Sequence, residues 1–318
     1  MGVLTRKVVQ LLVVLLIVTF FSFLLLSLMP GDPVEVMVPY GSEEQRAEIR
    51  GDLGLDDPMP VRYVTWLGGF LRGDFGKYYT VSSDRPVSER LGDALPVSLQ
   101  LMLYAQVLAL VVAVPLGIFS AYRAGSRFDK VANTTAFGLL AIPSFAIALL
   151  MAYYVGVKLR LLPVGGYREL GDGAVEHFRR MLMPAVSLAV GQIAVYMRLL
   201  RSDMIATLQE DYISMAVSKG VSPRRVLWRH ALRPSSLTLL TVAALNVGSL
   251  IGGAVVIEVI FQLPGMGMAI YEAILSRQYV AVQSFVAVIG VSYVVLNFLV
   301  DVLYGVVDPR IRDARALA

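Results

Sequence analysis

The sequence predicts an all-α, polytopic membrane protein with six transmembrane helices and an external subdomain after the first of them. Hydrophobic residues make up 57% of the 318 residues, and a mean hydropathy of +0.68 is too high for a soluble domain of this length. The apolar residues are gathered into blocks, most of them long enough to cross ~30 Å of hydrocarbon at about 1.5 Å per residue. Polar segments, several of them basic, separate the blocks.

Composition also restricts the function. The chain contains no cysteine, so disulfides, thiolate nucleophiles and cysteine-ligated metals are excluded. A pI of 9.2 is expected of a membrane protein with basic cytoplasmic loops. The sequence lacks the interleaved aromatic and basic residues that bind bases. We therefore expect membrane lipid, and no nucleic acid, as a partner.

The first span is predicted at residues 8–28, so that residues 1–29 form an N-terminal transmembrane helix. Arg6 and Lys7 precede this run and place its start in the cytoplasm. The run is too long for the apolar core of a signal peptide, and SLMPGDP follows it instead of a small-residue cleavage site. We expect an uncleaved helix.

Residues 30–94 are predicted to form the external subdomain, because they carry twelve acidic and seven basic side chains. Ser42 and Gln45 have the spacing of a capping box, and Gly54 follows as a stop signal, which predicts a short helix over 43–53. A second amphipathic helix is predicted from four apolar residues at helical spacing: Val61, Val64, Leu67 and Leu71.

Residues 95–305 are predicted to form a five-helix permease core, followed by a cytoplasmic tail at 306–318. The expected spans are 95–119, 132–157, 182–200, 235–257 and 281–304. Pro143 predicts a kink in the third span. Residues 158–181 are expected to be an external loop that contains His177, and 258–279 are expected to stay outside or dip back into the membrane. An even number of spans places both termini in the cytoplasm.

The most basic of the polar interruptions between the later spans is residues 198–234, which we predict to be a cytoplasmic helical hairpin. Gly220 supplies the left-handed position that ends a helix, Ser222 is a good N-cap, and Pro223 fits the first helical position. Pro234 is expected to stop the second helix. An apolar stripe on the first helix indicates that the hairpin docks against a partner: Ile205, Leu208, Tyr212 and Ala216.

The sequence contains no recognisable catalytic set. His177 and His230 are the only histidines, and this topology places them on opposite sides of the membrane, so they cannot share a metal. A phosphate-binding loop of the GxxxxGK[ST] type is also missing. The chain is therefore predicted to be non-catalytic, and any ATP chemistry must come from another chain.

The predicted spans carry few ionisable residues, which weighs against an ion-coupled carrier. Glu258 and Asp301 lie near span ends, where a pathway role and a solvated end residue both remain open. The polar but neutral residues within the spans are Gln106, Gln192, Asn246 and Asn297, and hydrogen bonding between helices is the commonest use of such residues. The sequence instead favours a membrane pathway energised by a cytoplasmic partner.

The hairpin sequence DYISMAVSKGVSPRRVLWRHALRPS resembles the EAA loop of bacterial ABC importer permeases, although Ser214, Met215 and His230 depart from the general pattern. Further segments resemble permeases of the dipeptide/oligopeptide family, first-subunit type, in that family's order. These are MPGDPV, LGLDDPMPVRYVTWLGGFLRGDFG, VSERLGDALPVSLQL, FQLPGMG and YGVVDPRIR. The resemblance covers nearly the whole chain.

This resemblance implies a type I ABC importer permease in the bacterial inner membrane. It implies a heterodimer with a second homologous permease, two cytoplasmic ABC ATPase subunits and an external substrate-binding protein that delivers dipeptides or oligopeptides. ATP and Mg would be held by the ATPases, with no cofactor on this chain. Nickel, haem or another small solute is the alternative cargo, and an ion-coupled secondary transporter is the alternative class.

The resemblance and the residues together select three groups. The expected ATPase-coupling residues are Asp211, Tyr212, Ser214, Ala216, Lys219, Gly220, Pro223, Arg224 and Arg225. Of these, Tyr212, Ala216 and Gly220 are expected in the buried surface and the cations at its rim. The expected outer gate or binding-protein contact comprises Glu258, Phe261, Leu263, Pro264, Gly265 and Gly267, because LPGMG does not continue a helix easily. The candidates for the pathway are Asn246, Asn297 and Asp301.

Overall fold

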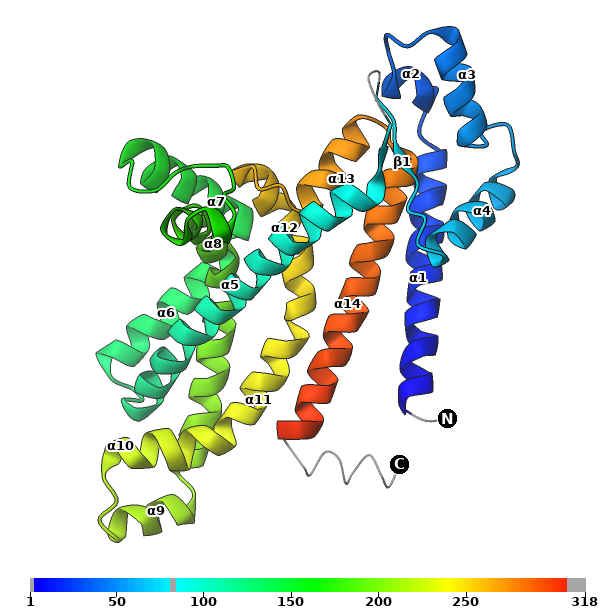
Figure 1. Ribbon diagram of the computed structural model, residues 1–318. Helices are drawn as coiled ribbons and strands as arrows, with labels where there is room; N and C mark the ends of the chain where they lie inside the picture. The colour runs from blue at the N-terminus through cyan, green and yellow to red at the C-terminus, as the bar shows by residue number, and fades with distance from the viewer. Residues whose placement is uncertain (1–2, 81–83, 308–318) are drawn as a thin grey trace. The chain divides into compact units, whose positions relative to one another are not determined.

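The computed structural model describes residues 3–80 and 84–307 and is almost entirely helical (Figure 1). The helices are α1 Val3–Ser27, α2 Pro33–Met37, α3 Glu43–Asp52, α4 Met59–Leu71, α5 Val87–Tyr122, α6 Arg127–Ala141, α7 Ser144–Met151, η1 Ala152–Lys158, η2 Leu170–Asp172, α8 Ala174–Leu208, α9 Asp211–Ser218, α10 Pro223–Arg225, η3 Val226–Ala231, α11 Leu232–Leu245, α12 Val247–Phe261, α13 Met266–Leu275 and α14 Tyr279–Val307. Within the described residues, the antiparallel pair β1 Lys77–Tyr78 and β2 Arg85–Pro86 is the only sheet.

The predicted spans correspond to helices. Three are long and apolar enough to cross a membrane, namely α5, α8 and α14 over Tyr279–Phe298. If each of two bent helix pairs counts as one span, the number rises to five. One pair is α6 with α7 and η1, and the other is α11 with α12. Helix α1 is the remaining predicted span, and it is 25 residues long. The predicted helices at 43–53 and 61–71 are confirmed as α3 and α4.

The third predicted span is broken at Pro143, not kinked. Its two halves meet at an angle of 99°. Ile142 adopts an extended conformation (φ −96°, ψ 120°) and Pro143 becomes the N-cap of α7. The pyrrolidine ring of a proline disfavours the α conformation in the residue before it, and the ring nitrogen has no hydrogen to donate. Together these effects end α6 and let the chain change direction.

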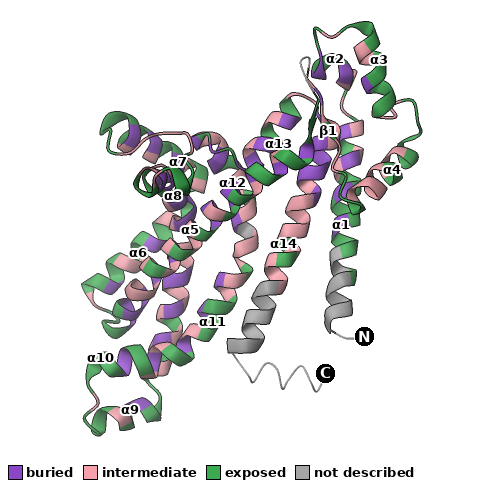
Figure 2. Cartoon of the chain, viewed as in Figure 1, coloured by how far each residue is buried: buried purple, intermediate pink, exposed green. Residues whose placement is uncertain are grey.

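The chain divides into two compact units. The first unit contains residues up to Ser98 together with Leu263–Phe298. Its larger core packs α1, the start of α5, α13 and α14, with Val87 and Phe285 fully buried. A smaller core joins α2 and α3 around Val34, Ile49 and Tyr79 (Figure 2).

The side chain of Gln278 attaches the external segment of the first unit to the turn between α13 and α14. Its amide oxygen accepts the N–H of Tyr79 (3.0 Å), and its amide nitrogen donates to the carbonyl of Tyr79 (2.6 Å). Nearby, the hydroxyls of Tyr78 and Ser276 lie 2.8 Å apart. Gly76 has φ +80°, and a Cβ at this position would lie 2.3 Å from Val280. Glycine is therefore required where the segment passes α14.

The second unit is built around α8, which packs against α6, α7, α11 and α12. A layer of polar side chains crosses its apolar interior. The Tyr196 hydroxyl donates to Gln106 (3.2 Å), and the Asn246 amide donates to Gln192 (3.0 Å). Each bond joins side chains from two different helices. The use predicted for Gln106, Gln192 and Asn246, hydrogen bonding between helices, is thus confirmed.

The prediction of a loop over 158–181 is wrong at its end, because α8 begins at Ala174. His177 is consequently a fully buried helical residue. One ring nitrogen, Nδ1, lies 2.7 Å from the carbonyl oxygen of Arg168 and the other, Nε2, lies 3.0 Å from the Tyr104 hydroxyl. Because a carbonyl can only accept, Nδ1 carries the proton and Tyr104 donates to Nε2. The histidine therefore fastens the loop before α8 to α5.

Candidate coupling site

The hairpin predicted from the sequence is present, with an additional helix. Helix α8 runs to Leu208, α9 follows after a short break, and α10, η3 and α11 lead back. Gly220 has φ +76°, which confirms the left-handed turn. The N–H of Val221 donates to the carbonyl of Ala216 (3.1 Å) and closes the end of α9. Ser222 is the N-cap before Pro223, as predicted, but its hydroxyl makes no capping bond.

The prediction that Pro234 stops the second helix is wrong. Helix α11 runs through it after the π-helical turn η3. In an α-helix the N–H of residue 234 would donate to the carbonyl of His230, and proline has no such hydrogen. The Tyr212 hydroxyl lies 3.4 Å from this carbonyl and donates to it from α9. The two arms of the hairpin therefore compensate for the missing bond. Burial and the carboxylate of Glu210 raise the pKa of Tyr212, which keeps it a donor.

Figure 2 shows that the hairpin has both buried residues, which we call inner, and exposed residues, which we call outer. The inner side chains are Ile213, Val226, Leu227 and Ala231. The outer apolar side chains, 44–58% exposed, are Tyr212, Met215, Val217 and Trp228. We call these four the outer apolar surface, which extends around α9 because Met215 and Val217, two positions apart in this helix, point to different sides of it. The sequence pattern identified Tyr212 but missed the other three, because their spacing does not continue the stripe of α8.

The remaining predicted coupling residues differ little in burial. Ala216 is half-buried. The others are exposed: Asp211, Ser214, Lys219, Gly220, Pro223, Arg224 and Arg225. Among the described residues, apart from Gly220 and its chain neighbours, no atom lies within 4 Å of the Cβ position built on Gly220, so its requirement is conformational and not steric there. The cations Lys219, Arg224 and Arg225 are exposed, and their place at the rim of a docking surface stays a prediction.

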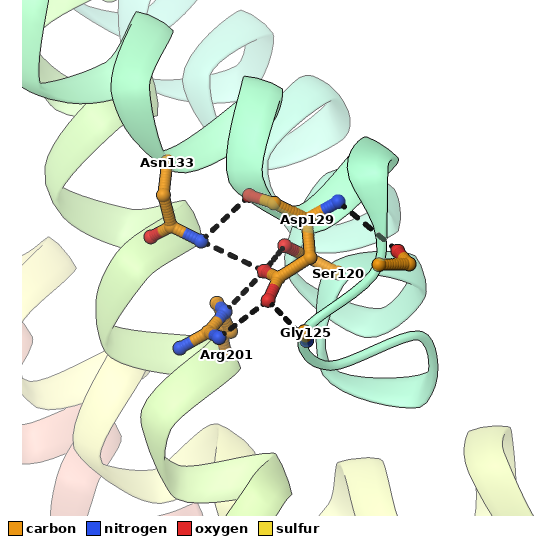
Figure 3. A network of polar contacts seen from close by, with 6 residues as sticks. Ser120, Gly125, Asp129, Asn133 and Arg201 are labelled. Atoms are coloured by element: carbon orange, nitrogen blue, oxygen red, sulfur yellow. Dashed lines mark hydrogen bonds and ion pairs between the residues drawn. The ribbon is translucent and has the colours of Figure 1, made fainter.

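A buried ion pair fixes α8 next to the hairpin (Figure 3). The side chain of Asp129, at the start of α6, is 4% exposed and that of Arg201, on α8, is 25% exposed. Two guanidinium nitrogens donate to the two carboxylate oxygens, Nε at 2.5 Å and Nη2 at 2.6 Å. Three further donors complete the site: the Ser120 hydroxyl (2.5 Å), the Gly125 N–H (2.8 Å) and the Asn133 amide (2.8 Å). A buried carboxylate with this many donors is fully compensated.

Two further contacts strengthen this part of α8. Arg198, one turn before Arg201, lies over the ring of Phe137 on α6, 3.7 Å from its centroid. The hydroxyls of Thr207 and Ser235 lie 2.9 Å apart and join α8 to α11. Helices α6, α8 and α11 are thus connected immediately before the hairpin. The hairpin that carries the outer apolar surface is therefore attached to three helices that are joined to one another.

The sequence interpretation missed the ion pair. A usable signal was present, because Ser126 and Asp129 have capping spacing and Asn133 follows one turn later. The Ser126 hydroxyl does accept the N–H of Asp129 (3.3 Å). The partner Arg201 lies 72 residues further along the chain, and spacing alone does not reveal it.

The predicted outer gate has two parts. Glu258 and Phe261, on α12, are buried, and the Phe261 carbonyl accepts the N–H of Gly166 (3.1 Å). The segment after Gln262, which has φ +51°, belongs to the other unit. There Leu263 is fully buried, Gly265 and Gly267 are buried, and Pro264 is exposed. The irregular backbone predicted for LPGMG is confirmed at Leu263–Gly265 but wrong for Met266 and Gly267, with which α13 begins, and a gating role stays a prediction.

The pathway candidates separate in the structure. Glu258 is buried, which excludes the alternative that it is a solvated residue at the end of a span. Asn246 lies at the junction of α11 and α12, where it bonds to Gln192. Asn297 donates to the carbonyl of Tyr293 in its own helix (2.8 Å), not to another helix. Asp301 belongs to α14, but its side chain lies outside the described part, as do residues 308–318 of the predicted tail.

Comparison with known proteins gives three results. The family described as "Binding-protein-dependent transport system inner membrane component" matches residues 113–313, and its N-terminal companion family matches residues 1–102. The "Probable peptide ABC transporter permease protein y4tP" of Sinorhizobium fredii is 37% identical, covering 98% of this chain and 100% of the relative. The "Oligopeptide transport system permease protein AppB" of Bacillus subtilis is 37% identical, covering 96% and 98%.

A solved structure is also similar. The inward-facing methionine ABC transporter MetNI aligns with a TM-score of 0.54 at 14% identity, over 69% of this chain and 96% of that chain. At this identity the likeness concerns the fold alone. The fold predicted from the sequence, a polytopic type I ABC importer permease, is confirmed.

Proposed function

This chain belongs to the family of binding-protein-dependent transport system inner membrane components, and on that premise we propose that it is the permease subunit of an ATP-driven peptide importer. It forms half of the translocation pathway and pairs with a second, homologous permease. Two ABC ATPase subunits hold ATP and Mg and carry out hydrolysis, and an external binding protein delivers the peptide. A peptide cargo is supported by the names of two relatives that match nearly the full length of the chain.

The observation that supports the coupling role is the outer apolar surface, which lies on a hairpin connected to α6, α8 and α11. Tyr212, Met215 and Val217 project from α9, and Trp228 projects from η3. Exposed apolar side chains surrounded by charges are typical of a protein interface. Because α6, α8 and α11 are joined beside the hairpin, a force applied to α9 moves these helices together. ATP binding would close the ATPases, draw the two hairpins together and open the pathway outward, and hydrolysis would reset it.

Three substitutions test the coupling role. Gly220→Val forces a β-branched residue into a left-handed conformation at a cost on the order of 1–2 kcal/mol and re-aims both arms. Ala216→Trp places bulk at the docking surface and would hold the ATPase away. Both should insert normally yet lose ATP-driven uptake, or release the ATPase during purification. Arg224→Ala, at the exposed rim, should be milder because solvent screens its charge. Normal uptake by both severe variants would remove the hairpin from the mechanism.

Cargo and energy source need a separate experiment. Purification with native partners, followed by identification of the ligand bound to the binding protein, separates peptide from nickel, haem or another small solute. Reconstituted complex should require ATP and binding protein for uptake. Uptake by this chain alone, driven by a proton or sodium gradient, would instead indicate a secondary transporter.

We place both termini and the hairpin in the cytoplasm and residues 30–94 outside. The absence of cysteine makes this testable by labelling single cysteines. A cysteine at Ser42 should react with an impermeant maleimide from outside, and one at Ser218 only from the cytoplasm. The reverse pattern would invert the topology.

A further inference from the structure

Helix α4 contacts two membrane-spanning helices below their ends, although it belongs to a segment predicted to be external. The hydroxyls of Tyr63 and Thr19 lie 2.9 Å apart, and the indole N–H of Trp66 donates to the Ser284 hydroxyl (3.2 Å). Thr19 precedes the last residue of α1, Ser27, by eight residues, about 12 Å along a helix. Ser284 follows the first residue of α14 by five, about 8 Å. Figure 1 shows α4 beside the upper half of α1 and not beyond its end.

One side of α4 is fixed to these helices by aromatic contacts. The Tyr63 ring packs edge-on against Phe20, with centroids 5.6 Å apart, and lies 5.7 Å from Phe23. The rings continue through Trp66 to Phe70 at 5.4 Å. These contacts set both the depth of α4 and the side that it turns outward.

The outward side of α4 is apolar and uncovered in the first unit. None of its 13 residues is buried. Its most exposed apolar side chains are Val61 at 49%, Val64 at 65% and Leu71 at 66%. Apolar side chains of α1 are also exposed, with Phe21 at 56% and Leu25 at 66%. Both helices therefore expose apolar side chains within the first unit.

The ends of α4 suit an apolar surrounding. An α-helix leaves its first N–H groups without partners, and these are costly in hydrocarbon. Pro58 and Pro60 remove two of these donors from the chain, and Val61 and Arg62 donate to the Pro58 carbonyl at 2.9 and 3.2 Å. Charged residues occur only near the ends, at Asp57, Arg62 and Arg72. Asp57 and Arg72 are exposed and can reach the headgroups, whereas the Arg62 guanidinium lies over the Phe23 ring of α1, 5.5 Å from its centroid.

We propose that α4 is an interfacial membrane helix, embedded in the outer leaflet, whose outward side contacts lipid acyl chains. The occupant is lipid and not a protein partner, because the depth of Thr19 and Ser284 places this side at the level of the hydrocarbon. The external segment is thereby held to the bilayer at α4, while the charged helix α3, EEQRAEIRGD, remains in water.

Spin labelling of the full transporter in lipid nanodiscs tests this proposal. Val64→Cys is labelled with a nitroxide, and Glu44→Cys on exposed α3 is the matched control. Depth is obtained from relaxation by oxygen, which concentrates in hydrocarbon, against a water-soluble nickel chelate, and is calibrated with spin-labelled lipids. The label at Val64 should lie roughly 5–10 Å below the headgroup boundary. The label at Glu44 should lie in water.

Two results would overturn the proposal. A label at Val64 that the nickel chelate relaxes as strongly as the control would place α4 in water. A label that is immobilised and shielded from both relaxants would show that protein, such as the second permease, covers the surface. A mobile label with strong oxygen relaxation and weak nickel relaxation supports lipid contact.

Discussion

Arg201→Ala should destabilise the protein far more than an ordinary loss of an ion pair. The carboxylate of Asp129 is 4% exposed and would stay behind without its counter-charge. Breaking a buried pair by removing one partner costs about 3–5 kcal/mol. Three donors remain on Asp129, namely Ser120, Gly125 and Asn133, so we expect the lower end of that range.

A second substitution separates charge burial from lost packing. Asp129→Asn alone should also destabilise the protein, since it leaves the guanidinium without a charged partner. Combined with Arg201→Ala, it removes the uncompensated charge, because an amide needs no counter-ion. The double variant should therefore be more stable than the sum of the single effects predicts, by roughly 1–3 kcal/mol.

The measurement is an SDS titration of the purified full chain in mixed micelles, followed by circular dichroism. Arg224→Ala is the control, because its side chain is exposed and its effect should stay within about 0.5 kcal/mol. Strictly additive single effects would refute the described pair. An Arg201→Ala variant as stable as the control would show that the carboxylate needs no cation.

Three further predictions concern single contacts. Gly76→Ala should detach the external segment from α14, because its Cβ would lie 2.3 Å from Val280 at φ +80°, and limited proteolysis should then cut near residue 80. Gly73→Ala is the control, because Gly73 also has positive φ but its Cβ would meet no atom of the described residues within 4 Å. The control should show only the conformational part of the effect. Gln278→Leu removes both bonds to the backbone of Tyr79 and should raise amide hydrogen exchange there, with unchanged exchange counting against the contact. Tyr212→Phe removes the hydroxyl that donates to the His230 carbonyl and should lower the free energy of unfolding by about 0.5–1.5 kcal/mol. Amide hydrogens of η3 should then exchange faster, and unchanged exchange would show that the hydroxyl does not stabilise the hairpin.

Local patterns in the sequence were sufficient for the individual helices. Ser42 caps α3 as predicted, since its hydroxyl accepts the N–H of Gln45 (3.2 Å). Gly54 and Gly220 both adopt positive φ. These features depend on residues within a few positions of one another, and the intrinsic preference of each residue decides them.

Features that depend on distant parts of the chain were not predictable in this way. Asp129 and Arg201 meet because α6 packs on α8, and no periodicity encodes that packing. Pro143 and Pro234 illustrate the limit: the first breaks its helix by 99° and the second is accommodated within α11. The surrounding structure causes this difference. A π-helical turn precedes Pro234, and the Tyr212 hydroxyl donates to the His230 carbonyl, which receives no hydrogen bond from the proline. Similarly, the sequence of α4 is amphipathic, but only its contacts with Thr19 and Ser284 indicate its depth.

The π-helical turn Val226–Ala231 accommodates one additional residue without changing the rotational setting of α11. Such a turn holds about one residue more than an α-helical turn within one revolution. Deleting one residue there would give an α-helical turn, and Ser235 would stay beside Thr207. Deleting one residue just after the turn, in the α-helical part of α11, would instead rotate everything beyond it by roughly 100°. The Ala243 carbonyl would then leave the Tyr196 hydroxyl, which lies 3.4 Å away. The π-helical turn is therefore the place where this helix tolerates a change in length.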